Sequence, residues 1–150
     1  MLIASARPTN RAIKDFNIIE QMQKLQVVAI MNLEEPGEHP VCGEGLVSDR
    51  IGFSYDPEVI NNAGIAYFNP YWEDLTLTTY NKVLSICQLM DNFVKRAPEN
   101  KVFVHCHAGM GRTAIVCCSY LIFAGIATNG QDAIKLVQTQ RPGALAKKNA

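Results

Sequence analysis

Three features that would narrow the function at once are missing from this 150-residue sequence: an excess of one charge, a long apolar run and a regular cysteine pattern. Lysine plus arginine and aspartate plus glutamate each total 14, so the net charge is zero and we expect no nucleic-acid partner. The N-terminal apolar run extends only from Leu2 to Ala4, and no run reaches the roughly 18 apolar residues that span a bilayer. We therefore expect neither a signal peptide nor integral membrane contact.

Five cysteines are present, an odd number without regular spacing, which argues against a disulfide framework. They are Cys42, Cys87, Cys106, Cys117 and Cys118. We expect a reducing, intracellular and cytoplasmic location, with buried structural thiols as the default. A Walker-type nucleotide loop is absent. No spacing of His, Asp, Glu and Cys indicates a metal site, so we expect no metal and no cofactor.

Short β-branched and aromatic runs alternate with helical periodicities, which predicts an α/β sheet covered by helices. Residues 1–10 read as an irregular lead-in, and a helix capped by Thr9 or Asn10 follows. Its core face is expected to hold Ile13, Phe16, Ile19, Met22 and Leu25. The other expected helices cover residues 57–63, 79–97, 113–124 and 130–140. The expected strands cover residues 26–33, 65–68 and 101–104, with a short edge strand at 52–55.

The stretch 102–113 carries the most informative pattern, because a strand, a bend with two glycines and a helix start follow one another there. Such a bend can turn its N–H groups inward at one spot, where the helix adds its own free N–H groups and its dipole. The result is an anion cradle, which Arg112 can close with a two-pronged grip on a tetrahedral oxyanion. Cys106 lies at its floor, where the same field favours the nucleophilic thiolate.

The pattern His105-Cys106-x-x-Gly109-x-x-Arg112-Thr113 resembles the signature of the cysteine-dependent protein tyrosine phosphatases, in their dual-specificity branch. Together with residues 32–39, it looks most like the group of protein tyrosine phosphatase domain-containing protein 1. The resemblance implies a central sheet of four or five mostly parallel strands flanked by helices, with the cradle at the carboxyl end of a central strand. It also implies one catalytic domain over residues 1–150, which ends where family members usually add another helix.

The chemistry that the resemblance implies is hydrolysis of a phosphate ester through a cysteinyl phosphate. Cys106 is the expected nucleophile, and loop N–H groups with the Arg112 guanidinium are expected to stabilise the phosphoryl oxygens. The expected substrate-binding residues are His107, Ala108, Gly109, Met110, Gly111 and Arg112.

The general acid that protonates the leaving oxygen is assigned by resemblance to Asp74, on a loop that also carries Trp72. Glu73 is the second choice, and a merely solvated loop acid is the alternative. Thr113 follows the arginine as Ser or Thr does in this family, so its hydroxyl is expected to reach the Cys106 sulfur; a plain helix cap is the other interpretation.

Further roles rest on the family pattern. His105 is expected to hold the loop by hydrogen bonds or to be an ordinary core histidine, and His107 lies at the loop mouth, where it either biases specificity or is incidental. Arg7, before Pro8, lines the pocket or is simply exposed. Asn149 falls near the place where relatives position the hydrolytic water, although Ala150 occupies the adjacent slot and the usual glutamine is absent. A second cysteine could also form a redox bridge to Cys106.

The predicted function is therefore a protein phosphatase that hydrolyses phosphotyrosine and also phosphoserine or phosphothreonine in a phosphorylated protein substrate. An inositol-lipid phosphatase is an alternative, but His107, Ala108 and Met110 lack the positive charge that extra phosphates require. A catalytically weak phosphopeptide-binding module is a third hypothesis, which the joint presence of Cys106, Arg112 and Asp74 opposes. Sulfur transfer would leave the arginine and the aspartate unexplained. The oligomeric state cannot be read from the sequence.

Overall fold

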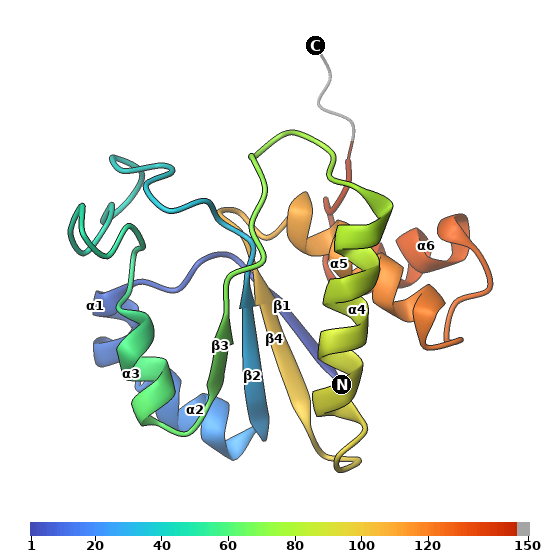
Figure 1. The fold of residues 1–150 in the computed structure, drawn as a ribbon, viewed down its shortest axis with the longest axis horizontal. Coiled ribbons are helices and arrows are strands. Elements are labelled where there is room, and N and C mark those ends of the chain that lie inside the picture. Colours follow the sequence, from blue (N-terminus) through green and yellow to red (C-terminus); the bar gives the residue numbers. More distant parts are fainter. Residues whose placement is uncertain (147–150) are drawn as a thin grey trace.

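The computed structural model describes residues 1–146, which build a four-stranded sheet with helices on both faces (Figure 1). All strand pairs are parallel, and the strand order is β1-β4-β2-β3. The strands are β1 (Leu2–Ser5), β2 (Val27–Asn32), β3 (Ala66–Phe68) and β4 (Lys101–His105). This confirms the predicted class, a mostly parallel sheet of four or five strands flanked by helices.

Within the described part of the chain, six helices cover the sheet in two layers. They are α1 (Asn10–Asp15), α2 (Ile18–Lys24), α3 (Pro57–Asn62), α4 (Tyr80–Val94), α5 (Arg112–Phe123) and α6 (Gly130–Gln140). The first three pack on one face, and α4 and α5 pack on the other with α6 outside α5. Side-chain caps start four of these helices, at Thr9, Asp56, Thr79 and Asn129.

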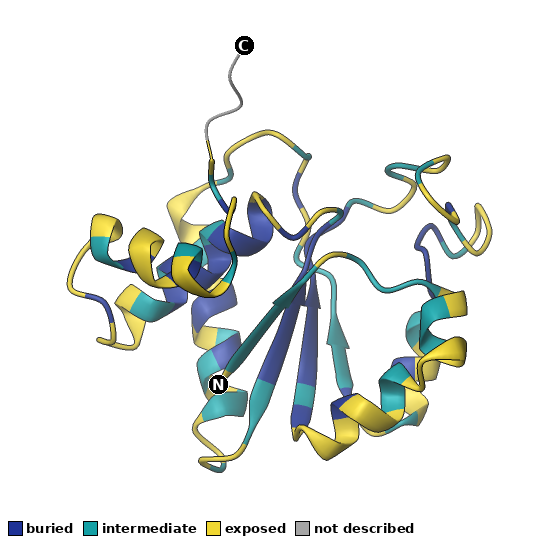
Figure 2. Cartoon of the chain, turned by 180° about the vertical axis from the view of Figure 1, so that it is seen from behind, coloured by how far each residue is buried: buried dark blue, intermediate teal, exposed yellow. Residues whose placement is uncertain are grey.

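The central strands β2 and β4 are buried on both faces, as a parallel sheet requires (Figure 2). In β4, Val102 and Val104 belong to the apolar cluster under α4 and α5, whereas Phe103 belongs to the cluster under α2 and α3. Ile30 of β2 joins Phe103 in the second cluster. This alternation fixes the register of β4, because a slip by one residue would exchange the two faces.

The strand predictions for the first 55 residues are wrong at two places. The lead-in contains β1, in which Leu2 pairs with Val102 and Ser5 with His105. The edge strand expected at 52–55 is absent from the described structure: residues 53–55 form bends, and Gly52 has a φ of +74°, outside the range of a strand. Its aromatic residues are buried all the same, since the loop folds over the sheet and Tyr55 is 0% exposed.

The first predicted helix is interrupted in its middle. Asn17 adopts a left-handed conformation, with a φ of 50°, and separates α1 from α2. The break rotates the helix face, so that Met22 is buried in the core while Phe16 is 66% exposed. The expectation that Phe16 and Leu25 belong to the core face is therefore wrong, since Leu25 is also exposed.

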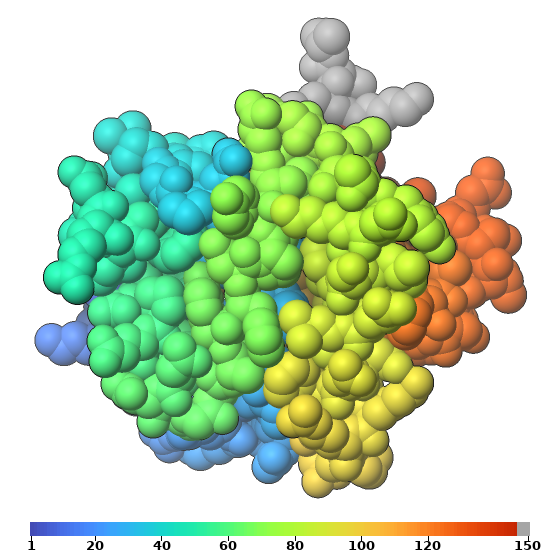
Figure 3. Space-filling model, in the orientation of Figure 1, coloured from blue at the N-terminus to red at the C-terminus, as the bar shows by residue number. Residues whose placement is uncertain are grey.

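Because every strand runs in the same direction, all four carboxyl ends lie at one edge of the sheet. The segments that follow them cover residues 6–9, 33–56, 69–79 and 106–111. Figure 3 shows the surface of the segment after β3 lying beside the segment after β2 at this edge. Among the described residues, no helix is both long enough and apolar enough to cross a membrane.

Candidate active site

The turn that joins β4 to α5, here called the signature loop (residues 106–111), forms the centre of the site. Cys106 is its first residue and is 3% exposed. Its carbonyl groups are bonded away from the loop: the His107 oxygen accepts from Arg7 N at 3.0 Å, and the Met110 oxygen accepts from Leu145 N at 2.9 Å. Because a peptide N–H points opposite to its C=O, the N–H groups face the loop interior. Within the described chain, the N–H groups of residues 107–112 have no acceptor, as an anion site requires.

Arg141, at the end of α6, closes the loop from outside. Its Nε donates to the Gly109 oxygen at 2.6 Å, and its Nη2 donates to the Ala108 oxygen at 3.1 Å. Gly109 has a φ of +73°, and a Cβ at this position would overlap the carbonyl of Ser5. The glycine therefore permits both the left-handed turn and the close approach of β1.

His105, the last residue of β4, is completely buried and holds the loop from below. Its Nδ1 lies 3.2 Å from the Cys106 carbonyl oxygen, which can only accept, so Nδ1 carries the proton. Its Nε2 then accepts from the Tyr55 hydroxyl at 2.6 Å. Burial lowers the pKa of His105 to about 4, so the ring is neutral and both bonds keep their direction at physiological pH.

Arg112, the first residue of α5, is 2% exposed and reaches across the site. Its two Nη atoms make a fork with the Glu38 carboxylate, with Nη1 donating to Oε2 at 2.8 Å and Nη2 to Oε1. Nη1 also donates to the carbonyls of Leu33 and Trp72, at 3.1 and 2.9 Å. Nε is buried and has no partner within the described residues. The edge formed by Nε and Nη2 is thus the one that can take a phosphoryl oxygen pair.

Asp74 lies beside this guanidinium, with Oδ1 3.4 Å from Arg112 Nη2. Its Oδ2 accepts from His39 Nε2 at 2.9 Å. Partial burial would raise the pKa of Asp74, but the bonds to His39 and the charge of Arg112 outweigh it and leave the pKa lowered. Glu73 is exposed on the same loop. Of the two candidate acids, only Asp74 has a side-chain contact with the site in the described structure.

The other predicted residues occupy distinct positions. Thr113 is buried, and its hydroxyl has no hydrogen-bond partner within the described chain. His107 stacks on His39 at 3.8 Å between ring centroids. Arg7 is not exposed: its side chain pairs with buried Glu34 at 3.2 Å. The candidates Asn149 and Ala150 lie outside the described residues.

The cysteines outside the signature loop remain free thiols, like Cys106 itself. Burial raises the pKa of Cys87 to about 11 and that of Cys117 to about 12, and it also raises the pKa of Cys118. These three therefore remain protonated. Cys42 is half-buried and lies on the segment after β2.

Four contributors to the site were missed by the sequence reasoning: Glu38, His39, Tyr55 and Arg141. Arg141 comes from the end of α6 and holds the signature loop. The other three come from the segment after β2, and they meet Arg112, Asp74 and His105 respectively. Their one sequence signal was the position of Glu38 and His39 in the stretch 32–39, which supported the family resemblance without indicating a contact.

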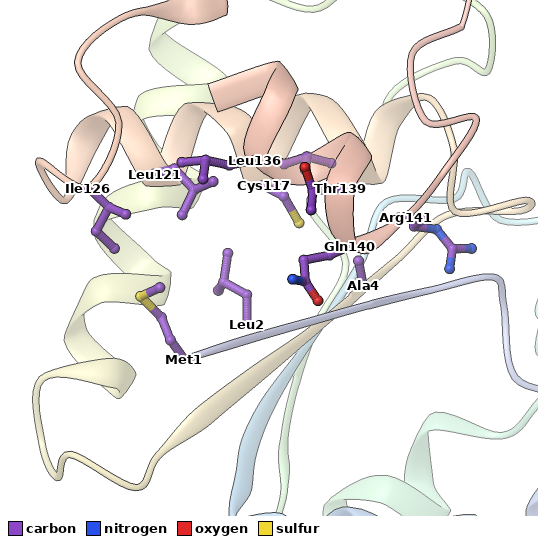
Figure 4. A pocket seen from close by; sticks show the side chains of 11 residues that line it. Met1, Leu2, Ala4, Cys117, Leu121, Ile126, Leu136, Thr139, Gln140 and Arg141 are labelled. Carbon is purple, nitrogen blue, oxygen red and sulfur yellow. The ribbon is translucent and has the colours of Figure 1, made fainter. Parts of the chain in front are cut away.

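A cavity of about 490 Å³ lies apart from this site, between β1, α5 and α6 (Figure 4). Its lining is mainly apolar and includes Leu2, Leu121 and Ile126. Arg141 borders one end, where Figure 4 shows its guanidinium pointing away from the apolar side chains. Cys106 does not line this cavity.

The comparisons with known proteins agree with this geometry. The profile described as dual specificity phosphatase, catalytic domain, matches residues 13–149, so the chain belongs to the dual-specificity phosphatases. Protein tyrosine phosphatase domain-containing protein 1 of Danio rerio is 36% identical over 144 residues, which cover 96% of this chain and 20% of the relative. The protein of that name from Mus musculus is 38% identical over 144 residues, with 96% and 19% covered. The resemblance to this group is thereby confirmed.

Solved structures show the same fold. The crystal structure of Tk-PTP in its active form superposes with a TM-score of 0.74, covering 97% of this chain and 83% of that chain at 20% sequence identity. The present chain spans only about a fifth of the length of the curated relatives it matches.

Proposed function

We propose that this chain is a catalytic domain that hydrolyses phosphotyrosine, and also phosphoserine or phosphothreonine, in phosphorylated proteins in the cytoplasm. The observation that carries the proposal is the signature loop: its carbonyls are bonded outward, and within residues 1–146 its N–H groups next to Cys106 have no acceptor. Nε of Arg112 likewise has no partner in this part of the chain, so phosphoryl oxygens can be bound by backbone and guanidinium together.

In the first step, the Cys106 thiolate attacks phosphorus and the bond from phosphorus to the ester oxygen breaks. The ester oxygen leaves with a proton from Asp74. Because His39 and Arg112 hold Asp74 ionised in the free enzyme, the phosphoryl group has to draw Arg112 away before Asp74 can carry that proton. The products are a free hydroxyl group and a cysteinyl phosphate.

In the second step, Asp74 removes a proton from water while the water oxygen attacks phosphorus. The sulfur–phosphorus bond breaks, and the Cys106 thiolate and inorganic phosphate are released. The Thr113 hydroxyl, which is buried and free of other partners within the described chain, is available to donate to the departing sulfur. Its cost as an unpaired buried group is of order 1–3 kcal/mol, which a hydrogen bond to the thiolate would offset.

A protein substrate is favoured over an inositol lipid, because the side chains that project from the signature loop carry no fixed positive charge. His107 is neutral at physiological pH, since burial and the neighbouring His39 lower its pKa. Met110 is 37% exposed at the rim and offers an apolar contact. Among the described residues, the signature loop (residues 106–111) supplies no cationic side chain for the extra phosphates of a lipid headgroup, whereas a singly phosphorylated side chain needs only Arg112.

The test compares wild type with Cys106→Ser in hydrolysis of an aryl phosphate, with a chelator present. We expect turnover that vanadate inhibits and that the variant loses. Turnover that survives in the variant would overturn the cysteine mechanism, and a folded wild type that binds vanadate without turnover would support the phosphopeptide-binding module instead. Phosphopeptides and inositol phosphates, assayed in parallel, decide between the two substrate classes.

A further inference from the structure

Three potential metal ligands meet at the mouth of the signature loop. They are His39, Cys42 and His107, whose ligand atoms all lie within 4.8 Å of one another. The proposed chemistry assigns none of their side chains to the reacting atoms, and His39 enters it only through its bond to Asp74. We propose that these three side chains bind a zinc ion, and that the bound metal inhibits the enzyme. The inhibition rests on the proposed phosphatase function, whereas the binding does not.

The first two ligands are arranged by a tight turn. Cys42 N donates to the His39 oxygen at 3.3 Å, and Cys42 Sγ lies 3.8 Å from His39 Nδ1. Arg7 fixes the backbone of this turn, because its Nη2 donates to the carbonyls of His39 and Cys42, at 3.0 Å each. The guanidinium is itself held by buried Glu34, so the pair of ligands stands on a rigid base.

The third ligand comes from the signature loop. The imidazole of His107 is stacked on that of His39, with an interplanar angle of 12°. Its backbone position is set by the bond from Arg7 N to the His107 oxygen. Arg7 therefore contacts all three ligand residues through their carbonyl groups.

The tautomer of His39 suits a metal at Nδ1. Asp74 Oδ2 accepts the proton of His39 Nε2, which leaves the lone pair on Nδ1, the nitrogen that faces Cys42. Carboxylate–histidine pairs of this kind orient metal-binding imidazoles in proteins. The sequence alone does not indicate this metal site, because only His39 and Cys42 are close in sequence and His107 joins them through the fold.

Two imidazoles and one thiolate favour zinc over calcium or magnesium, which prefer oxygen ligands. Binding would displace the proton of the Cys42 thiol, and the remaining position of a tetrahedral site would be taken by water. The metal would join the segment after β2 to the signature loop. It would also hold Asp74 on His39, away from the proton transfer that catalysis needs.

The binding test uses the variant Cys106→Ser, so that the metal cannot bind to the nucleophilic thiolate. Its readout is metal binding and does not depend on catalytic activity. Cobalt(II) replaces zinc as a coloured probe, and the thiolate-to-cobalt absorption band is followed during titration. We expect one equivalent to bind with this band. The band should vanish in the double variant Cys106→Ser/Cys42→Ser. It should persist in Cys106→Ser/Cys118→Ala, which removes a cysteine of α5 that is not one of the three proposed ligands. Asp74→Ala should weaken binding about 10- to 100-fold, because it removes the partner of His39.

A band that survives Cys42→Ser, or that is already absent in Cys106→Ser while present in the wild type, would overturn the proposed site. Circular dichroism establishes that each variant is folded. For the inhibitory role, zinc is added to wild type and to Cys42→Ser, and each is compared with its own chelated activity. Cys42→Ser should need at least about tenfold more zinc for the same fractional inhibition. Equal sensitivity would show that zinc inhibits elsewhere, at Cys106 itself.

Discussion

The Arg112 guanidinium divides its donors between the protein and a ligand. Its Nη1–Nη2 end is paired with Glu38, and its Nε has no partner among the residues that the structure describes. A hydrogen bond to a charged group is worth roughly 1.5–3 kcal/mol. We therefore expect Glu38→Gln to lower kcat/KM by about 10- to 100-fold, measured on an aryl phosphate, because the guanidinium loses its orientation.

The matched control is Glu35→Gln, which removes a neighbouring carboxylate that has no side-chain contact with Arg112 in the described chain. An unchanged or increased kcat/KM in Glu38→Gln would contradict this prediction. It would mean that Glu38 competes with the phosphoryl group for Arg112.

The pH dependence of turnover distinguishes Asp74 from Glu73. A general acid must be protonated to act, so its loss removes the fall of kcat at high pH. Asp74→Asn should flatten that basic limb and lower kcat about 100-fold, whereas Glu73→Gln should leave the limb in place. The opposite pattern, measured over the same pH range, would transfer the role to Glu73.

His105 should make the fold sensitive to acid. Its pKa is about 4 in the folded protein and 6.5 for the free side chain, so below 6.5 the unfolded chain binds the extra proton. The neutral His105 ring therefore leaves the unfolding free energy at its full value above pH 6.5, and part of this free energy is lost progressively as the pH falls toward 4. The loss amounts to about 3 kcal/mol.

The measurement is urea unfolding of wild type and His105→Gln at several pH values. Between pH 7 and pH 4 the wild type should lose about 3 kcal/mol more than the variant, since glutamine does not titrate. Parallel pH curves for the two proteins would refute the burial of a neutral imidazole.

For single residues, the sequence predicted that Cys106 and Arg112 lie together in one loop. Both belong to the short bend between one strand and one helix, so their relative position is set locally. Glu38 could not be predicted as the partner of Arg112. Their contact depends on how the long segment after β2 folds back over the sheet, which no local pattern encodes.

Among the elements, the signature loop depends most strictly on one backbone conformation. Gly109→Ala would place a Cβ against the Ser5 carbonyl in a left-handed conformation that itself costs about 1–2 kcal/mol. We expect more than about 2 kcal/mol of lost unfolding free energy, together with loss of turnover. Gly130→Ala, in open space at the start of α6, is the control and should leave stability equal or slightly higher. Equal urea midpoints for the two variants would contradict the close approach of β1.

Elements with long periodic patterns were predicted well, and the short ones were not. The pattern for 130–140 corresponds to α6 in full, since an asparagine cap and an amphipathic face both mark it. Strand β1 has only four residues, and its partner β4 lies about a hundred residues further on, so nothing local identifies it. The break at Asn17 also escaped the periodicity, because the apolar spacing continues through it.

For the whole molecule, the decisive property is that the segments after the four described strands all begin at the same edge of the sheet, its carboxyl edge. An oxyanion bound there would contact the signature loop and reach the segments after β2 and β3 through Arg112, which bonds to Leu33, Glu38 and Trp72. Vanadate at about 100 times its Kd should therefore raise the unfolding free energy by about 2.7 kcal/mol and Tm by roughly 5–10 °C.

Hydrogen exchange then reports where the stabilisation lies. On addition of vanadate, protection of the backbone amides from exchange should rise in the segments 33–56 and 69–79 as well as in 106–111. The Arg112→Ala variant should show no such rise. Protection confined to 106–111 would show that the segments do not act together.

The place of β4 in the sheet also has a consequence for biosynthesis. β2 and β3 can pair early during translation, because they are close in the chain, but β1 pairs only with β4 and must wait for it. Until then the nascent chain carries an unpaired apolar strand, which is open to aggregation or to capture by chaperones. Strand β4, which positions the nucleophile, is therefore also the strand that completes the sheet when it emerges from the ribosome.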